Sequence, residues 1–244
     1  MNTAVGAARI GSSILRFIAA LMIMLMMSYG GYSLWDGYMI SRGAFLSGDL
    51  LKYKPTGDSG DSLSMEELMV INKDVRGWLT IDDTSIDYPV VQGETDMDYV
   101  NKDVMGDFSF SGSIFLSCLN QPDFMDGYSL IYGHNVDTGG MFADVKKFTE
   151  SEFFDNHKTG TLYLKNQSLK IELFACMEAD GYDRIIYAPG EECNIEDLLS
   201  YLEKSSVCYR EVGVTAEDRI IGMSTCENAE TNGRIILFGR LVEK

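Results

Sequence analysis

The longest uninterrupted apolar stretch of the chain lies near its N-terminus, from Phe17 to Trp35, and contains no charged residue. As a helix its nineteen residues would span roughly 28 Å, which matches a hydrocarbon core of about 30 Å. The run ends in Tyr32, Trp35 and Asp36, an aromatic boundary suited to the membrane interface, and lacks the small-residue site of a cleaved signal peptide. The pattern therefore predicts an uncleaved membrane anchor, with a buried core helix as the alternative.

The charges around this stretch predict its orientation and the division of the chain. Arg9 and Arg16 precede it and no acidic residue does, so the positive-inside rule places the N-terminus in the cytoplasm. A turn-rich polar segment at 54–60 indicates a tether or a joint between helices. We therefore expect a cytoplasmic segment at 1–16, a single transmembrane anchor at 17–35, a juxtamembrane linker at 36–62 and one extracellular domain at 63–244.

The remainder of the chain consists mainly of short β-rich runs bounded by Gly, Asp, Asn and Pro. Seven or eight such strands predict a closed barrel or a sandwich, mainly β with helical insertions. The runs lie at 86–91, 112–116, 128–132, 161–164, 169–177, 219–224 and 234–241.

Three helices are expected among these strands. Ser64 and Glu67 form a capping-box pattern, and the apolar residues that follow, as far as Val75, share one helical face, so we expect a helix ending at Gly77. A second helical insertion is expected at 141–148. The third begins after Asn194, a plausible N-cap, where leucine and isoleucine recur at helical spacing.

The chain is strongly acidic, with a formal net charge of −17. We therefore expect no binding to nucleic acid, because the phosphates of nucleic acids bind basic protein surfaces. Anionic lipid would also repel the domain, so membrane attachment must come from the anchor. The many acidic residues are no reason to expect a calcium site.

Five cysteines are widely spaced, without a C-x-x-C pair, which argues against a zinc site. Their odd number leaves at least one free thiol in an oxidising compartment, where a free thiol is often kept for its reactivity. Cys118 and Cys176 lie in apolar runs, and we interpret both as buried small hydrophobes.

Three residues carry the candidate chemistry. His134 follows the apolar run 129–132 and opens a loop, a position that faces the mouth of a barrel. Cys226 ends one predicted strand, and Arg234 begins the next, so both flank one hairpin-like connection. The second histidine, His157, lies in a polar turn and is interpreted as a solvated loop residue.

These residue types together form an acyl-transfer site. A thiol with a pKa near 8.5 needs a neighbouring base or cation to attack an amide, and an imidazole supplies both. The same imidazole can protonate the leaving amine and then accept a proton from the incoming nucleophile. A permanently charged arginine can donate to the oxyanion or to the carbonyls that position it.

At these residues the chain resembles the class B sortases, cysteine transpeptidases of Gram-positive cell surfaces. The resemblance extends from the anchor to the last strand, with small departures: Gly222-Met223 replaces the usual Thr-Leu, and Glu227 stands where aspartate is common. The matching segments are Met223-Ser224-Thr225-Cys226, Gly233-Arg234, Tyr132-Gly133-His134-Asn135, Gly77-Trp78-Leu79-Thr80-Ile81, the run 86–93, Gly140-Met141-Phe142-Ala143-Asp144 and the helix after Asn194.

The resemblance implies an eight-stranded sortase β-barrel preceded by N-terminal helices and an anchor. It further implies that Cys226 cleaves a C-terminal sorting signal after threonine and holds the acyl part as a thioester. An amine of a cell-wall precursor or of a neighbouring pilin then resolves it. The resemblance implies neither a metal nor an organic cofactor. Tyr132, Ser224, Thr225 and Glu227 resemble positions that line the peptide groove, and the segment 181–192 lies where the family places its substrate-gripping loop.

Two other functions fit the residues. A surface cysteine protease would use the same nucleophile with water as the acceptor, a choice that depends on groove shape and water access. A non-catalytic barrel would bind a peptide or wall polymer and keep the thiol for structure.

Overall fold

The computed structural model describes residues 2–44, 48–55, 65–136, 139–190, 193–226 and 232–243. The chain divides into two compact units, Met1–Ile40 and Ser41–Lys244. A single helix, α1 (Asn2–Ala44), makes up the first unit and supplies the first residues of the second.

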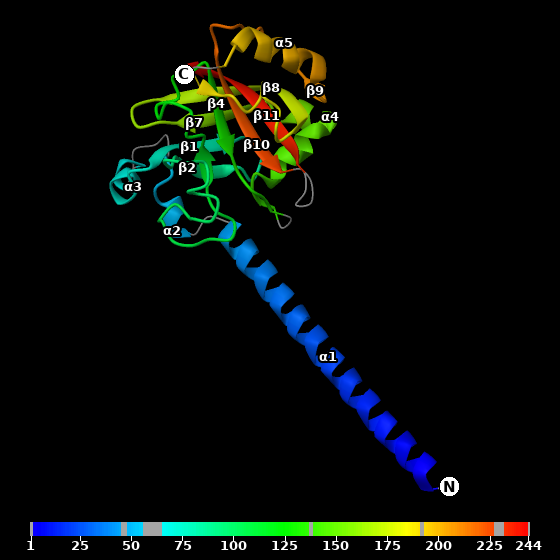
Figure 1. Ribbon diagram of the computed structural model, residues 1–244. Helices are drawn as coiled ribbons and strands as arrows, with labels where there is room; N and C mark the ends of the chain where they lie inside the picture. Colours follow the sequence, from blue (N-terminus) through cyan, green and yellow to red (C-terminus); the bar gives the residue numbers. More distant parts are fainter. Residues whose placement is uncertain are drawn as a thin grey trace. The chain divides into compact units, whose positions relative to one another are not determined.

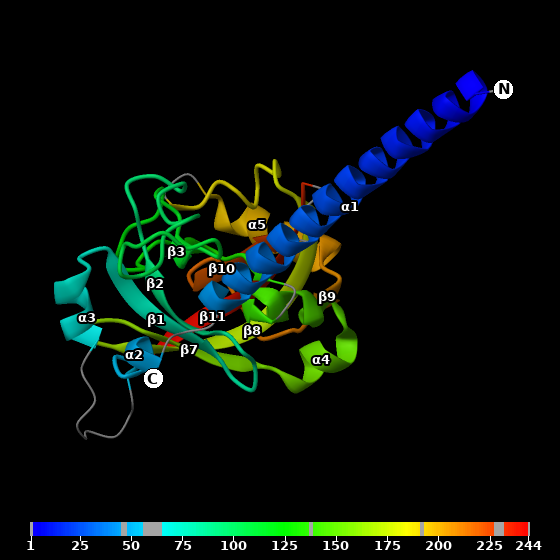
Figure 2. The same cartoon turned by 90° about the horizontal axis from the view of Figure 1, so that it is seen from below.

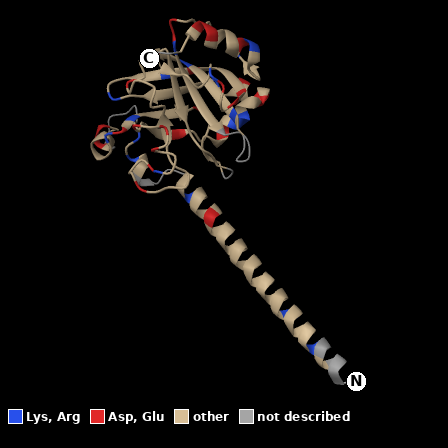
Figure 3. Cartoon of the chain, viewed as in Figure 1, with Lys and Arg blue, Asp and Glu red and all other residues tan. Residues whose placement is uncertain are grey.

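Helix α1 has the length and composition of a membrane-spanning segment. Its stretch from Arg9 to Ala44 has a window with a mean hydropathy of 2.0, and none of that window is buried. Charged residues are sparse along this helix, whereas they are scattered through the elements of the second unit (Figure 3). These properties suit a membrane anchor or a signal sequence. The expected boundaries at residues 16/17 and 35/36 both fall inside this one helix.

Eight strands of the second unit close into a barrel (Figures 1 and 2), which confirms the predicted fold. Their order is β11-β10-β4-β3-β2-β1-β7-β8, and β8 pairs back onto β11. A short strand, β9 (Cys208–Tyr209), extends β8, and β5 (Asn135–Val136) pairs with β6 (Gly140–Met141) apart from the barrel. The barrel strands are β1 (Val75–Ile81), β2 (Asp87–Val91), β3 (Ile114–Leu116), β4 (Tyr128–Tyr132), β7 (Thr159–Tyr163), β8 (Ser168–Asp180), β10 (Arg219–Cys226) and β11 (Gly233–Glu243).

Helix α5 (Ile195–Ser205) covers the outer face of the strands that carry the candidate site. Asn194 caps it as predicted, because its side chain accepts hydrogen bonds from the backbone N–H groups of Glu196 and Asp197. Leu198 and Leu202 are fully buried and pack on residues of β4, β8, β10 and β11. Strand alternation leaves the opposite faces of these strands to fill the barrel interior.

The predicted helix from Ser64 to Gly77 was wrong at its C-terminal end. Helix α3 (Met65–Ile71) stops after two turns, and the Asn72 side chain accepts from the N–H of Asp74 in the turn that follows. Val75 then begins β1, where a β-branched residue suits the pleated sheet. Gly77 is a point of close strand approach, since a Cβ there would lie 2.7 Å from the carbonyl oxygen of Tyr163.

The remaining helices are short. A 3₁₀-helix, η1 (Ala143–Thr149), occupies most of the expected 141–148 insertion. Helices α2 (Gly48–Leu51) and α4 (Ser151–Asn156) were not expected. A tight turn joins β7 to β8, with the N–H of Leu164 donating to the carbonyl of Gln167.

The carboxylate of Asp144 connects η1 to the turn between β1 and β2. It accepts hydrogen bonds from the backbone N–H and the Oγ of Ser85, at 2.7 and 2.8 Å, and pairs with Lys147 at 2.8 Å. Burial alone would raise the pKa of Asp144, but the hydrogen bonds from Lys147 and Ser85 outweigh it and lower the pKa. The ionised carboxylate therefore stabilises the fold above the ordinary aspartate pKa, and this contribution is lost as pH falls through the lowered pKa.

We expect Asp144→Asn to reduce the free energy of unfolding at neutral pH by about 1–3 kcal/mol, because hydrogen-bond donors lose their charged acceptor. The difference from the native chain should shrink as pH falls below about 4, since both chains then present a neutral group. Urea unfolding across pH measures it. Asp82→Asn, at an exposed residue with one hydrogen bond to Thr159, is the control and should change stability by less than about 0.5 kcal/mol. A difference that does not vary with pH would contradict this account.

Candidate active site

The ends of three neighbouring strands meet at one end of the barrel. β4 runs parallel to β10, with Tyr132 opposite Ser224, and β10 runs antiparallel to β11, with Cys226 opposite Arg234. The backbones of Cys226 and Arg234 are thus paired across the connection between the two strands, as expected. The side chain of Cys226 lies outside the description, as does Glu227 altogether.

His134 lies two residues beyond the last paired residue of β4. The N–H of Gly133 still donates to the carbonyl of Ser224 at 3.1 Å, so the ladder between β4 and β10 continues past Tyr132. His134 and Cys226 each follow the pair Tyr132–Ser224 by two residues, His134 just beyond β4 and Cys226 at the end of β10. The backbone of both residues therefore lies at the same end of the barrel.

The imidazole of His134 is half-buried and has a defined partner. Its Nε2 lies 3.1 Å from the carbonyl oxygen of Val100. Because a carbonyl oxygen only accepts, Nε2 carries the hydrogen, and Nδ1 is the ring nitrogen left for another neighbour. The carbonyl of His134 in turn accepts from the N–H of Phe142 at 3.0 Å, which holds the following loop.

Arg234 is half-buried on β11. Its Nη1 donates to the carbonyl of Gly233 at 3.0 Å, and no ion pair with a carboxylate of the described residues is found for it. Gly181 packs near the guanidinium, since a Cβ there would lie 3.6 Å from Cζ of Arg234. Within the described part of the chain, the carbonyl of Gly233 is the hydrogen-bond partner found for this side chain.

Ser224 and Thr225 are both buried, each 2% exposed, on opposite faces of β10. The Oγ of Ser224 lies 2.9 Å from the hydroxyl of Tyr187. The Oγ1 of Thr225 has no hydrogen-bond partner among the described residues. Of the two predicted groove residues on β10, Ser224 is therefore the one whose side chain contacts the 181–190 segment.

Tyr187 is a site residue that sequence reasoning did not single out. Its ring stacks on Tyr132, with centroids 6.3 Å apart and an interplanar angle of 9°. It comes from the 181–190 segment, where Ile186 is fully buried against the α5 layer and Asp183 accepts from the hydroxyl of Tyr201 at 2.6 Å. The segment is thus fixed to the barrel, and its Tyr187 contacts both Tyr132 and Ser224.

Burial also affects the chemistry of Tyr132. The pKa of its hydroxyl is raised, first by burial and then by the nearby carboxylate of Asp96. Tyr132 therefore stays neutral and can donate a hydrogen bond throughout the physiological range.

Comparison with known proteins decides the family. No protein-family model matches the chain. The chain is 36% identical over 184 residues to sortase B of Listeria monocytogenes, covering 74% of each protein. The crystal structure of a Streptococcus pyogenes class B sortase involved in pilus biogenesis is 39% identical with a TM-score of 0.67, covering 75% of this chain and 100% of that one. The Staphylococcus aureus sortase B–substrate complex is 32% identical with a TM-score of 0.67, and the match covers 73% of this chain and 84% of that one.

The chain belongs to the sortase B family. This membership confirms the family expected from the motifs, and the structural similarity confirms the barrel.

The thiols of this sortase differ in exposure. Cys118 is exposed, so its predicted burial was wrong. It lies two residues beyond the end of β3, in a surface turn where its N–H donates to Asp96. Its pKa is nevertheless raised, by partial desolvation and then by that carboxylate. Cys176 is buried as predicted with a raised pKa, and burial raises the pKa of Cys193 to about 11. None of these three has the lowered pKa that a thiolate nucleophile needs.

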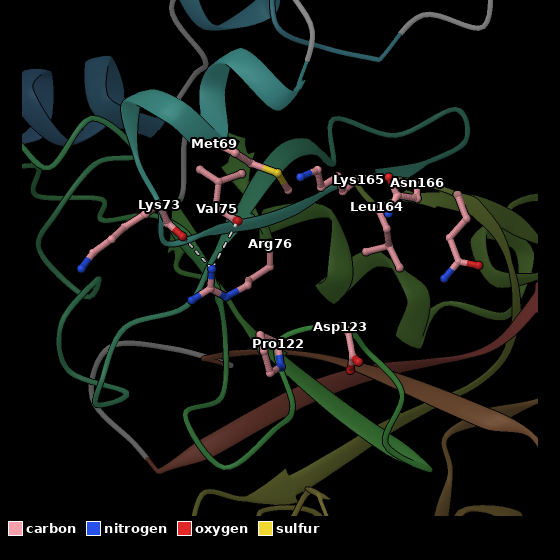
Figure 4. Close-up of a pocket in the computed structure, with 10 residues that line it drawn as sticks. Met69, Lys73, Val75, Arg76, Pro122, Asp123, Leu164, Lys165 and Asn166 are labelled. Atoms are coloured by element: carbon pink, nitrogen blue, oxygen red, sulfur yellow. Dashed lines mark hydrogen bonds between the residues drawn. The ribbon is translucent and has the colours of Figure 1, made fainter.

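A cavity of about 360 Å³ lies apart from these strand ends (Figure 4). In it the Nη1 of Arg76 donates to the carbonyl of Lys73 at 2.7 Å, and the Nε donates to Gln92 at 3.0 Å. None of the predicted site residues lines it, so we assign it no part in the chemistry. Its lining consists of Met69, Lys73, Val75, Arg76, Pro122, Asp123, Leu164, Lys165, Asn166 and Gln167.

Proposed function

We propose that this sortase is a cysteine transpeptidase that cleaves a C-terminal sorting signal after threonine and transfers the acyl part to an amine of the cell-wall precursor. The observation that supports the proposal is the meeting of the ends of β4, β10 and β11, where Cys226 pairs with Arg234 and His134 follows the end of β4. Membership of the sortase B family supports the same reaction class.

In the first half-reaction the sulfur of Cys226 attacks the threonine carbonyl carbon as a thiolate. The thiol proton passes to Nδ1 of His134, the ring nitrogen that does not contact Val100. The tetrahedral intermediate then collapses, the C–N bond breaks, and the imidazolium returns the proton to the departing amine. The product is a thioester on Cys226.

In the second half-reaction an amine of the wall precursor attacks the thioester carbonyl. His134 accepts a proton from the amine as the new C–N bond forms, and the proton returns to the leaving thiolate. Arg234 donates hydrogen bonds to the oxyanion of both intermediates or to the neighbouring peptide carbonyls. The cycle needs no cofactor.

The peptide groove in this proposal runs past Tyr132, Ser224, Thr225 and Glu227. Tyr187 and Ser224 hydrogen-bond to each other, so a peptide that takes a hydrogen bond from Ser224 must share or displace the Tyr187 hydroxyl. Thr225 would contribute through its backbone, because its side chain lies on the other face of the strand from Ser224.

We further propose that α1 anchors the enzyme, with the N-terminus in the cytoplasm and the barrel outside. The support is the apolar helix with Arg9 and Arg16 near its start and no acidic residue before Asp36.

Arg234→Gln is expected to lower kcat/KM for a sorting peptide by about 10²–10³-fold. This is the loss of rate that follows removal of one oxyanion donor in other enzymes. Arg240→Gln is the matched control on the same strand. Arg240 pairs with Glu172, so its loss should reduce stability while leaving kcat/KM within about threefold. Steady-state kinetics and thermal unfolding of both variants distinguish the roles. Equal losses of activity would show that Arg234 only supports the fold.

The acceptor is tested by analysing products with and without added amine. A transpeptidase forms the amide product at the expense of the hydrolysed acid as amine is added. If amine changes neither the products nor the rate, the protein is a surface cysteine protease. If no peptide is cleaved and iodoacetamide modifies Cys226 no faster than the other thiols, the barrel is a non-catalytic binder.

A further inference from the structure

An exposed apolar cluster lies on the loop between β2 and β3, at residues 101–111. Phe108 is 69% exposed, Met105 is 45% exposed and Phe110 is 41% exposed. The two phenylalanine rings pack edge to face, with centroids 4.9 Å apart. Three neighbouring exposed apolar side chains on one loop indicate an interaction surface rather than scattered surface residues.

The backbone of this 101–111 loop is held in one shape. The carboxylate of Asp103 accepts from the N–H groups of Met105 and Asp107, both at 2.9 Å, and the N–H of Asp103 donates to the carbonyl of Asp107. A β-bridge joins Lys102 to Phe108. The aromatic pair is therefore displayed on an ordered turn, so a partner need not order it first.

The same loop packs against the last turn of α1. A Cβ on Gly43 would lie 2.5 Å from the Oγ of Ser111 and 2.9 Å from that of Ser109, the residue between the two phenylalanines. Gly43 follows Trp35 by eight residues, about 12 Å of helix. The short covalent connection therefore tethers the loop with the aromatic pair to the apolar run.

The local charge permits contact with lipid, although the chain as a whole is acidic. Within the loop and the adjoining end of α1, Lys102 and Arg42 balance Asp103 and Asp107. Asp103 is moreover engaged by backbone N–H groups. An uncharged aromatic edge in such a setting suits the headgroup–acyl boundary, where aromatic side chains gather.

We propose that Phe108, Phe110 and Met105 insert into the interface of the bilayer that holds α1. This inference rests on the proposed anchor. The occupant is lipid rather than a protein partner, because the loop is joined to the proposed anchor by a short connection and the cluster is small for a protein interface. Val100, just before the loop, contacts His134, so docking would keep the catalytic end of the barrel close to the bilayer.

Tryptophan fluorescence of the full chain in phosphatidylcholine vesicles, with and without brominated acyl chains, tests the docking. Phe108→Trp is made in a Trp35→Phe background, where the other tryptophan, Trp78, is fully buried. We expect brominated lipid to quench position 108 and its emission to shift to the blue on insertion. Adding Phe110→Asp should abolish both effects, because a charge opposes insertion. All substituted loop positions are exposed, so the fold should persist, which circular dichroism checks.

Val207→Trp is the matched control, since Val207 is 49% exposed and lies elsewhere on the domain, just before β9. Quenching at 108 but not at 207 supports the proposal. Equal quenching at both positions, or a blue shift at 108 that does not depend on bromine, overturns it in favour of non-specific contact or self-association. The chain with its native Trp35 is measured separately and reports on the anchor. If lipid quenches Trp35 in that chain but does not quench the tryptophan at position 108 in the variant, docking is overturned and the anchor stands. If Trp35 is not quenched, the anchor and docking are overturned together. Thioester formation with a soluble peptide is measured separately and reports on the proposed reaction.

Discussion

Replacing Cys226 by alanine is expected to reduce both cleavage of a sorting peptide and transfer to an amine by about 10⁴-fold or more. Loss of the nucleophile removes the covalent path, and only the binding and oxyanion contributions remain. The fold should persist, because Cys226 is the last residue of its strand and a smaller apolar residue preserves the pairing with Arg234. Single-turnover kinetics with excess enzyme measures the residual rate.

Cys118→Ala is the control for this experiment. Cys118 is the exposed thiol among the four described cysteines, and its raised pKa leaves little thiolate at neutral pH. Its removal should leave the rate within about twofold of the native enzyme. A Cys226→Ala enzyme that still forms a thioester, or a Cys118→Ala enzyme that does not, would move the nucleophile to another residue.

His134→Ala is expected to lower the rate of thioester formation by about 10²–10⁴-fold, the usual contribution of a positioned general acid and base. The described contacts of His134 suit this role, because one ring nitrogen is fixed by Val100 and the other is left for a neighbour. The measurement is the pre-steady-state rate of thioester formation, with alkylation of Cys226 by iodoacetamide as a second readout. Alkylation should also slow, because fewer thiolates form without the imidazole.

The only other histidine supplies the control. His157 is half-buried at the end of α4, so its interpretation as a solvated loop residue was wrong. Its ring stacks on that of Phe153, with centroids 3.8 Å apart, and its Nδ1 contacts the Phe153 carbonyl. His157→Ala should reduce thermal stability and leave thioester formation nearly unchanged. If the two variants lose activity equally, or His134→Ala keeps full alkylation of Cys226, His134 is not the acid and base.

Local patterns predicted much of this fold because they act within one element. The run 128–132 coincides with β4, and the Asn194 cap starts α5 where expected. Cys226 and Arg234 could be placed opposite each other because a short connection between two β-rich runs favours a hairpin.

The errors arose where the deciding contact is distant in sequence. Val75 continues the helical periodicity of α3, yet it pairs with Val91 in the sheet, and Gly77 is needed for the approach of Tyr163. Tyr187 belongs to a segment without clear periodicity, and its site contacts, Tyr132 and Ser224, come from two other strands. Cys118 was interpreted as part of an apolar run, but β3 ends at Leu116 and Cys118 lies two residues beyond it in an exposed turn.

Intact-mass spectrometry of the native enzyme mixed with a panel of sorting peptides tests the central claim most directly. The account predicts a mass increase equal to the acyl part of one peptide, mapped by digestion to Cys226 and discharged when an amine is added. An enzyme that cleaves the peptide with no such adduct, or carries the adduct on another residue, would contradict it.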